Sequence, residues 1–229
     1  RLFDGGTVNR LGRVDDGTTV TDFDEEEVAR RHTLGSAPAF LEWNRTKINV
    51  IDTPGFANFL SDTRAALRVA DAAPVVVDAV SGVEVQTEKV WEIAAEGGIA
   101  RLVVLNRVDR ERASLERSLE SLRGAFGRAV VPVALPLGEE KDFAGVIDLV
   151  TMTACTYQGD GSGKFATGEV PAAHAAEAQA ARDALVEMVA EADDSLMEKY
   201  FEQGTLSQDD LVAGLRKATL AGRVFPLLP

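Results

Sequence analysis

The sequence predicts an α/β fold that is built on a mostly parallel sheet with helices on both faces. Short β-branched runs alternate with helical patterns along the chain, which is typical of parallel sheets whose strands are joined by helices. Polar tetrapeptides follow two of these runs. Of the 229 residues, 45% are hydrophobic, enough for one domain or for one domain with a large insertion.

The elements can be placed in order along the chain. Strands are expected at residues 38–43, 46–52, 73–79 and 101–106, and Asn44 and Arg45 form the turn between the first two. Helices are expected at residues 56–69, 84–96 and 111–126. Ligands of parallel sheets bind outside the carboxyl ends of the strands. Residues 52–55 (Asp-Thr-Pro-Gly) and 106–109 (Asn-Arg-Val-Asp) follow two such ends, so they are the candidate site.

Charge divides the chain into two parts. Of 37 acidic and 24 basic residues, residues 133–211 hold 16 acidic and 4 basic ones. A shift of this size marks a separate module, so we predict a main domain of residues 1–132 and 212–229 and an acidic insertion of residues 133–211. The net charge of −13 argues against general binding to nucleic acid or to anionic membranes.

The remaining composition favours a cytoplasmic protein. A single cysteine, Cys155, excludes an internal disulfide and fits a reducing compartment. No apolar run approaches the ~18 residues that a membrane span needs, and the first residues are not typical of a signal peptide. No role at a membrane is therefore expected.

The two tetrapeptides suit a guanine nucleotide. Asp52 can hold a magnesium ion through water, and Gly55 lets a backbone N–H approach a terminal phosphate. A carboxylate at Asp109 can accept two N–H bonds from the edge of guanine, a donor pair that adenine lacks. Each motif alone also fits a turn after a strand or, at Asp109, a helix N-cap. Together, in this order and 54 residues apart, they indicate a GTP site.

At these residues the chain resembles the GTP-binding domain of a translational GTPase, and most of all that of elongation factor G. VIDTPGFANF (50–59) is similar to the third G motif of that family and NRVD (106–109) to the fourth. ARRHTL (29–34), DAVSGVEVQTEKVW (78–91), DFAGVIDLV (142–150) and residues 197–226 are also similar. The resemblance implies a G domain of the P-loop NTPase type with an α+β insertion. It also implies GTP or GDP with Mg²⁺, and a monomer that acts on the ribosome.

The resemblance assigns roles to individual residues. Thr33 would close on magnesium and the γ-phosphate, and Asp52 would be the second residue of the metal site. Asn106, Arg107 and Asp109 would hold the base. Arg107 replaces a lysine whose stem packs on guanine, so we expect weakened binding rather than its loss.

Phe56 is the largest departure from the family. The family has a histidine there that positions the water that attacks GTP, and a phenyl ring can neither orient water nor accept a proton. We therefore expect weak hydrolysis. The alternatives are a GTP-binding factor that signals its bound state without useful hydrolysis, and a scaffold that no longer binds nucleotide.

The surroundings of these motifs carry further expectations. The Phe56 ring is expected to pack with Phe59 and Leu60. His32, where the family has an apolar residue, and His174 are expected to be solvated, and the acidic run at residues 22–27 to be a solvated, mobile segment.

The phosphate-binding loop of the family, G-x-x-x-x-G-K-[ST], has no match in the chain. We expect it, and the first strand of the sheet, before residue 1, and thus expect this chain to be part of a longer protein. A similar run at residues 159–164 has Gln158 and Phe165 at two required positions. A hairpin turn is the better interpretation of it.

The acidic insertion contains one long helical pattern, which we expect to run from Pro171 to about Gln203 and to end at Gly204. One face is apolar: Ala178, Ala181, Leu185, Met188, Val189, Ala192 and Leu196. Another face is acidic: Asp183, Glu187, Glu191, Asp194 and Glu198. The acidic face is either a solvated surface or a docking site for a basic partner. The resemblance implies the ribosomal stalk protein as that partner.

Overall fold

The computed structural model describes residue 8, residues 12–159 and residues 164–229. The chain forms two compact units. Unit 1 comprises residues 1–70 and 159–164, and unit 2 comprises residues 71–158 and 165–229. The predicted boundaries of the acidic insertion, at residues 133 and 211, stay a prediction. In the described part of the chain, no helix is both long and apolar enough to cross a membrane.

Unit 1 is built around a β-hairpin. Strands β1 (Ala37–Trp43) and β2 (Thr46–Asp52) pair antiparallel, with Trp43 opposite Thr46. Asn44 and Arg45 both have positive φ, 47° and 62°, as a two-residue type I′ turn requires. The hairpin follows helix α1 (Glu25–Arg30) and precedes a 3₁₀ turn (Ala57–Phe59) that leads into helix α2 (Leu60–Leu67).

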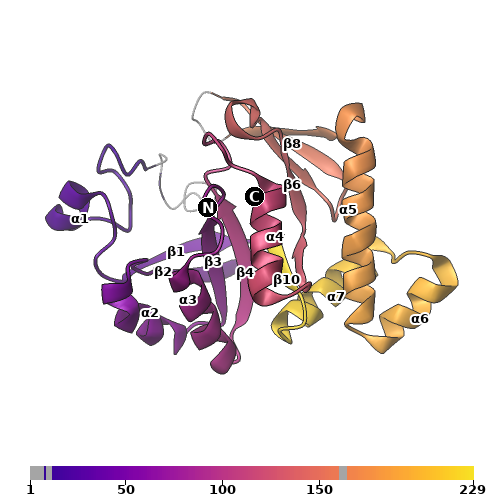
Figure 1. Cartoon of the computed structure of the whole chain (residues 1–229), viewed down its shortest axis with the longest axis horizontal. Helices are drawn as coiled ribbons and strands as arrows, with labels where there is room; N and C mark the ends of the chain where they lie inside the picture. Colours follow the sequence, from indigo (N-terminus) through magenta and orange to yellow (C-terminus); the bar gives the residue numbers. More distant parts are fainter. Residues whose placement is uncertain (1–7, 9–11, 160–163) are drawn as a thin grey trace. The chain divides into compact units, whose positions relative to one another are not determined.

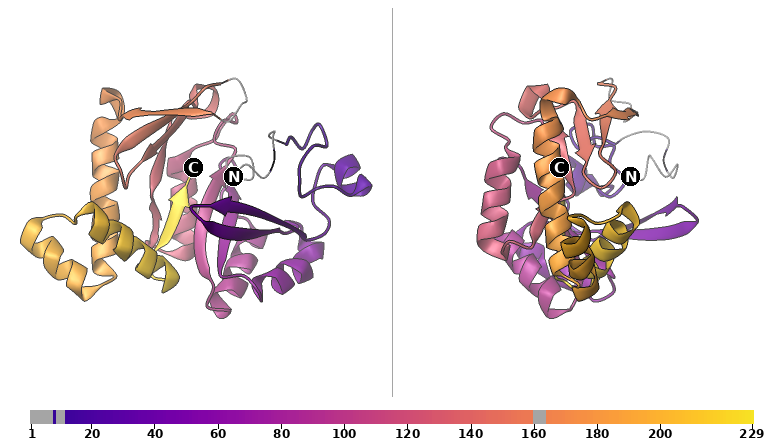
Figure 2. Two further views of the ribbon diagram at one scale, coloured as in Figure 1. Left: turned by 180° about the vertical axis from the view of Figure 1, so that it is seen from behind. Right: turned by 90° about the vertical axis from the view of Figure 1, so that its right-hand side faces the viewer.

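Unit 2 contains the predicted parallel sheet, so the predicted fold class is confirmed. Its strand order is β3-β4-β10-β5, and every neighbouring pair is parallel. The strands are β3 (Ala72–Asp78), β4 (Ala100–Asn106), β5 (Val130–Pro132) and β10 (Phe225–Leu228). The helices beside them are α3 (Val85–Glu96), α4 (Leu115–Phe126) and α7 (Gln208–Leu220). In Figure 1, α3 and α4 lie in front of these strands. The left view of Figure 2 shows unit 2 from behind, and α7 is visible there.

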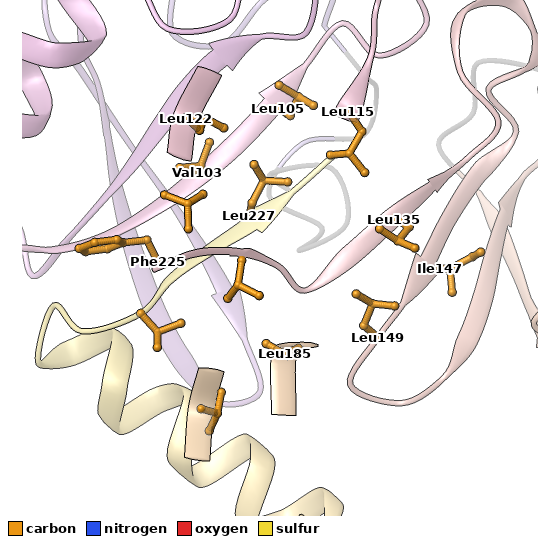
Figure 3. Close-up of a cluster of buried hydrophobic side chains, with 14 of the residues drawn as sticks. Val103, Leu105, Leu115, Leu122, Leu135, Ile147, Leu149, Leu185, Phe225 and Leu227 are labelled. Carbon is orange, nitrogen blue, oxygen red and sulfur yellow. The ribbon is translucent and has the colours of Figure 1, made fainter. Parts of the chain in front are cut away.

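The strands of this sheet are rich in β-branched residues and leucine because their side chains form the core of unit 2. Val103 of β4 and Leu227 of β10 are fully buried, and so is Leu122 of α4 (Figure 3). Trp91 of α3 stacks on Phe126 of α4 with ring centroids 4.1 Å apart. The sheet is therefore held by side chains from helices that the sequence also predicts.

A second sheet of unit 2 is antiparallel, in the order β6-β7-β8-β9. Its strands are β6 (Ala134–Leu137), β7 (Gly145–Asp148), β8 (Thr153–Tyr157) and β9 (Phe165–Glu169), and a 3₁₀ turn at Glu140–Asp142 precedes β7. Tyr157 pairs with Phe165, so β8 and β9 form the expected hairpin. Residues 160–163 of its connection lie outside the described residues.

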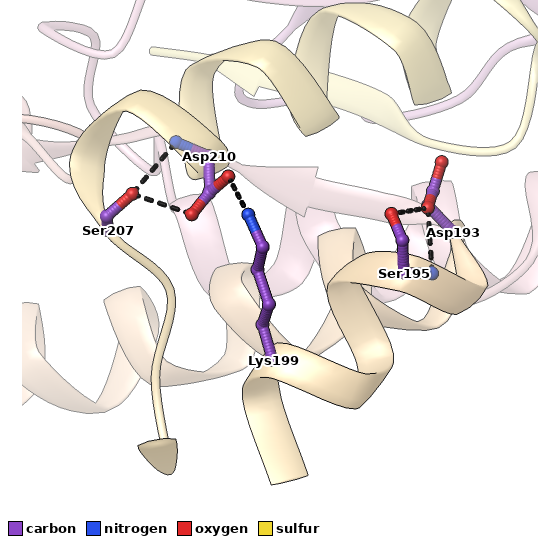
Figure 4. Close-up of polar contacts among 5 residues, drawn as sticks. All are labelled: Asp193, Ser195, Lys199, Ser207 and Asp210. Carbon is purple, nitrogen blue, oxygen red and sulfur yellow. Dashed lines mark hydrogen bonds and ion pairs between the residues drawn. The ribbon is translucent and has the colours of Figure 1, made fainter. Parts of the chain in front are cut away.

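The single long helix expected from Pro171 to Gln203 is wrong. The structure has α5 (Ala172–Glu191) and α6 (Asp194–Gln203), which ends at Gly204 as expected. Asp193 caps α6 by accepting a hydrogen bond from the Ser195 N–H at 3.0 Å, and its carboxylate binds Lys217 of α7. Lys199 of α6 also pairs with Asp210 of α7 at 2.6 Å (Figure 4). Contacts to α7 therefore accompany the break, and local sequence does not reveal them.

Two helix starts also differ from the prediction. Helix α4 begins at Leu115 with Ser114 as its N-cap, so Asp109 is not a helix cap. The segment after Gly55 opens as the 3₁₀ turn rather than as an α-helix that starts at Phe56.

Candidate functional site

The phosphate-side candidates lie in the loop after β2, in unit 1. Asp52 ends the strand and is half-buried. Pro54 is buried, and its carbonyl accepts a hydrogen bond from Thr63 of α2 at 3.4 Å. In the described part of the chain, a Cβ built on Gly55 would meet no atom within 4 Å. Packing within the protein does not require glycine there, whereas a closely approaching ligand would.

Glu27 organises the segment that contains Thr33. Helix α1 begins with a capping box between Asp24 and Glu27, in which the Asp24 N–H donates to Glu27 Oε2 at 3.3 Å. The Asp24 carboxylate also accepts a hydrogen bond from the Glu26 N–H at 2.9 Å. Glu27 is buried, and its Oε1 accepts the N–H groups of Leu34 at 2.9 Å and Gly35 at 3.1 Å. These hydrogen bonds lower the pKa of Glu27, and the bond from Leu34 has the largest effect.

The expectation that residues 22–27 form a solvated run holds for residues 23–26, which are exposed, and is wrong for Asp22 and Glu27, which are buried. The expected mobility of the run stays a prediction. The carboxylates of Asp24 and Glu27 bind backbone N–H groups that the chain would otherwise leave without protein partners. The sequence does not reveal that Glu27 is buried, because the backbone N–H groups that its carboxylate binds follow several residues later.

Thr33 is held by one of these acidic residues. Its hydroxyl donates to Asp22 Oδ1 at 2.7 Å, and Asp22 Oδ2 also accepts from Thr19 at 3.1 Å. The Thr33 oxygen keeps its lone pairs, which are what a magnesium ion would use. The metal role of Thr33 stays a prediction.

Phe56 contacts His32. Their ring centroids are 4.8 Å apart, with an edge-to-face angle of 66°. The side chain of Phe56 is 57% exposed, so the expected packing in a cluster with Phe59 and Leu60 is wrong. His32 is half-buried rather than solvated, and its Nδ1 lies 3.0 Å from the carbonyl oxygen of Arg30.

The second histidine lies elsewhere. His174 is partly solvated, with 33% of its side chain exposed, and its Nδ1 is 3.7 Å from a carboxylate oxygen of Glu177 on the same helix. This contact belongs to the surface of α5 and does not involve the candidate site residues.

The base-side candidates lie in the loop after β4, in unit 2. Asn106 ends β4, and its Oδ1 accepts the N–H of Arg107 at 2.9 Å. Arg107 has a left-handed backbone, with φ of 64°. Val108 is buried, and its carbonyl accepts the N–H of Glu140 at 2.9 Å. Val108 thus anchors the loop, and Asn106 and Asp109 are exposed on either side of it.

Arg107 is fixed by a residue that sequence reasoning missed. Its Nη1 donates to Asp78 Oδ2 at 2.8 Å, across the carboxyl ends of β4 and β3. Burial alone would raise the pKa of Asp78, but the hydrogen bonds from Arg107 and from two backbone N–H groups outweigh it and lower the pKa. Asp78 ends an expected strand and lies opposite Asn106 in the sheet register, which is the signal that could have revealed it.

The site residues therefore fall into two groups. Thr33, Asp52, Gly55 and Phe56 belong to unit 1, and Asn106, Arg107 and Asp109 belong to unit 2. Among the described residues, no group of three or more His, Cys, Asp or Glu side chains could hold a metal ion. Two protein oxygens, from Thr33 and Asp52, suit Mg²⁺, which keeps several waters and takes further oxygens from phosphates.

Comparison with known proteins identifies the family of the chain. The family model of the elongation factor Tu GTP binding domain matches residues 2–213. The crystal structure of the protein ttk003000868 from Thermus thermophilus matches 99% of this chain with a TM-score of 0.88 and 32% sequence identity. The match covers 34% of that protein, so this chain spans about a third of its length.

Proposed function

Because this chain belongs to the elongation factor Tu GTP-binding domain family of translational GTPases, we propose that it is the GTP-binding domain of an elongation factor G-like factor that acts on the ribosome. It binds GTP and GDP with Mg²⁺ and hydrolyses GTP slowly. The factor works in the cytoplasm as a monomer. The similarity of residues 78–91, 142–150 and 197–226 to elongation factor G supports this choice within the family.

Base recognition is assigned to the loop after β4. Asp109 has an exposed side chain, free of any helix-capping role, that can accept the two donors of guanine. Asn106 stands at the same exposed strand end. Arg107 is held by Asp78, which limits how its head can move over a base. This restriction supports weakened but retained guanine binding.

Phosphate and magnesium recognition is assigned to the loop after β2 and to Thr33. Asp52 and Thr33 offer oxygens to the metal, and the open space at Gly55 allows a phosphate to reach the backbone. Thr33 would have to turn from Asp22 toward the metal, since its hydroxyl now donates to that carboxylate. Binding of GTP would thus compete with the Thr33–Asp22 hydrogen bond.

Slow hydrolysis rests on one observation, the exposed phenyl ring of Phe56 directly after Asp-Thr-Pro-Gly. Phosphoryl transfer to water needs a residue that orients the attacking water, and a phenyl ring offers neither donor nor acceptor. Loss of such a group costs about 10²–10⁴-fold in rate, or ~3–5 kcal/mol of barrier.

The test is single-turnover GTP hydrolysis by the full-length protein on ribosomes. Phe56→His should raise the rate by at least about tenfold, because it restores a water-orienting group. Phe59→His, three residues later in the 3₁₀ turn, is the matched control and should not raise it. Equal rates for the wild type and Phe56→His would contradict the assignment.

The same observation favours a second candidate function, a GTP-binding regulatory factor that does not hydrolyse. Such a factor would bind GTP and associate with ribosomes in a nucleotide-dependent way, with no GTP consumed over many minutes. Both candidate functions require GTP binding, so the affinities for GTP and ATP are measured first by titration. Failure to bind GTP would leave only the scaffold alternative.

The acidic residues of α5 and α6 support an encounter with a basic partner, for which we propose the ribosomal stalk protein. Asp183, Glu187, Asp194 and Glu198 are exposed. Glu191 is partly engaged, because Arg128 donates to its two carboxylate oxygens at 3.2 and 2.6 Å. The break between α5 and α6 divides the predicted acidic face into two shorter groups.

A further inference from the structure

The contact between His32 and Phe56 brings together two positions at which this chain departs from the family. The resemblance to elongation factor G implies an apolar residue at position 32 and a histidine at position 56, whereas this chain has His32 and Phe56. The two rings touch, with centroids 4.8 Å apart. Building on the proposed function, we infer that His32 takes over the water-positioning role that Phe56 cannot perform.

The hydrogen bond of His32 determines which ring nitrogen is available. Nδ1 lies 3.0 Å from the Arg30 carbonyl oxygen, which can only accept, so Nδ1 carries a proton. In the neutral ring, Nε2 then has a free lone pair. Among the described residues, no hydrogen bond to Nε2 is found. A water molecule can therefore donate to it.

The backbone around His32 is fixed on both sides. Helix α1 ends at Arg31, whose left-handed φ of 59° turns the chain, and the His32 N–H donates to the Glu27 carbonyl at 3.3 Å. After His32, the Glu27 carboxylate holds the N–H groups of Leu34 and Gly35. The imidazole thus projects from a short, doubly anchored segment, which is what a positioning group requires.

The placement of His32 suits the reaction. It directly precedes Thr33, the residue assigned to magnesium and the γ-phosphate, and its ring lies against the residue that follows Gly55. The same contact ties the Thr33 segment to the Asp52–Gly55 loop within unit 1. The inference requires a water that donates to Nε2 to lie beside the γ-phosphate.

The step is ordinary hydrolysis. The water oxygen bonds to the γ-phosphorus while the bond from that phosphorus to the β–γ bridging oxygen breaks, and the electron pair stays on GDP. The proton of the water leaves with the inorganic phosphate. His32 accepts a hydrogen bond that aligns the water, and the reaction stays slower than in a protein with histidine at position 56.

A substitution cycle at positions 32 and 56 tests the inference. In the full-length protein on ribosomes, His32→Ala should slow single-turnover hydrolysis at least about tenfold, while GTP affinity stays within about twofold. In a Phe56→His background, His32→Ala should have little effect, because the new imidazole orients the water. His174→Ala, on the surface of α5, is the matched control and should hydrolyse like the wild type.

The outcomes separate this inference from the proposed function. Normal GTP binding with equal rates for the wild type and His32→Ala would overturn the inference alone. A protein that binds GTP without any hydrolysis would also overturn it, in favour of the second candidate function. Failure to bind GTP would overturn both.

Nitrogen NMR supplies a readout that does not depend on turnover. The chain has two histidines, so ¹⁵N-histidine spectra of the wild type and His174→Ala identify the signals of His32. We expect Nδ1 to be protonated in the free protein. The Nε2 signal should shift when GDP with aluminium fluoride, a mimic of the transferring phosphate, replaces GDP alone. An unchanged His32 spectrum would overturn the inference.

Discussion

Strands β2 and β4 have the same length and each leads into half of the candidate site, yet they are supported very differently. Six of the seven residues of β2 are exposed, Val50 at 39% among them. In β4, Val103 and Leu105 are buried at 0% and 1% exposure. The base-side motif thus extends from a packed sheet, and the phosphate-side motif from a two-stranded hairpin. Hairpins of that kind are marginally stable by themselves.

This difference matches the work that each half would do. Discriminating guanine from adenine needs fixed donors and acceptors, which a rigid strand end provides. Sensing the γ-phosphate needs a segment that can rearrange, and segments that move come from the less stable parts of a protein. The predictions below test this contrast, beginning with the largest expected effect.

The rigid half should read the base through Asp109. In the full-length protein, Asp109→Asn should reduce guanine preference at least about 50-fold and favour xanthine nucleotides, because a donor replaces an acceptor facing position 2 of the base. Competition titrations with GTP, XTP and ATP measure the change. A variant that kept full guanine preference would show that the 106–109 loop does not read the base.

The packing contrast can be measured with one substitution at two positions. Val103→Ala should lower the free energy of unfolding by about 2 kcal/mol, because it empties space in the core of unit 2. Val50→Ala, at the exposed position, should cost less than about 0.5 kcal/mol. Urea unfolding of the full-length variants provides both values. Similar losses would show that β2 is packed as tightly as β4.

Glu27 provides a pH test of unit 1. Its pKa is lowered in the folded protein, so its stabilising effect is complete above the ordinary pKa of glutamate and is lost as pH falls through the lowered value. The protection of the Leu34 and Gly35 amides, measured relative to their intrinsic exchange rates at each pH, should therefore fall in mildly to strongly acidic solution. In Glu27→Gln this protection should already be lower at neutral pH and should depend less on pH. Equal protection of these amides in both proteins would contradict the anchoring role.

The acidic insertion should give the smallest effect, since exposed charges act mainly on association rates. Reversal of Glu187 and Glu198 to lysine should slow ribosome association by several-fold at low salt, leave GTP binding unchanged, and lose its effect at high salt. Glu191→Lys needs separate treatment, because it also removes the ion pair with Arg128. Stopped-flow rates that do not respond to the double reversal would favour a merely solvated surface.

Local patterns predicted the parts of the fold that local interactions determine. Strand β2 has the predicted limits, because β-branched residues and the turn at Asn44 and Arg45 define it nearby. For the sheet strands β3 and β4, the predicted and observed limits differ by one residue at most. The short strands β5 and β10 were not predicted, since three or four residues give too little periodicity.

The errors come from distant partners. The chain breaks at Asp193, where Lys217 and the start of α6 both use its carboxylate, and a helical period cannot reveal a partner 24 residues away. Within the acidic run at residues 22–27, the burial of Glu27 was not predicted, because the backbone groups that its carboxylate binds belong to Leu34 and Gly35. The roles of the motif residues stay a prediction that rests on their chemistry. The His32 contact with Phe56 became visible only in three dimensions.

The exposed hairpin also affects how the protein can be handled. Among the described residues, β2 pairs with β1 alone, so its other edge carries unpaired backbone groups beside Ile48, Val50 and Ile51, each about 40% exposed. Apolar edge strands recruit further strands from neighbouring molecules and promote aggregation. Lys47, near the start of β2, and Asp52, at its end, are the two charged residues of the strand that oppose such growth. Concentrated or heated preparations of this 229-residue stretch should therefore first self-associate through this edge.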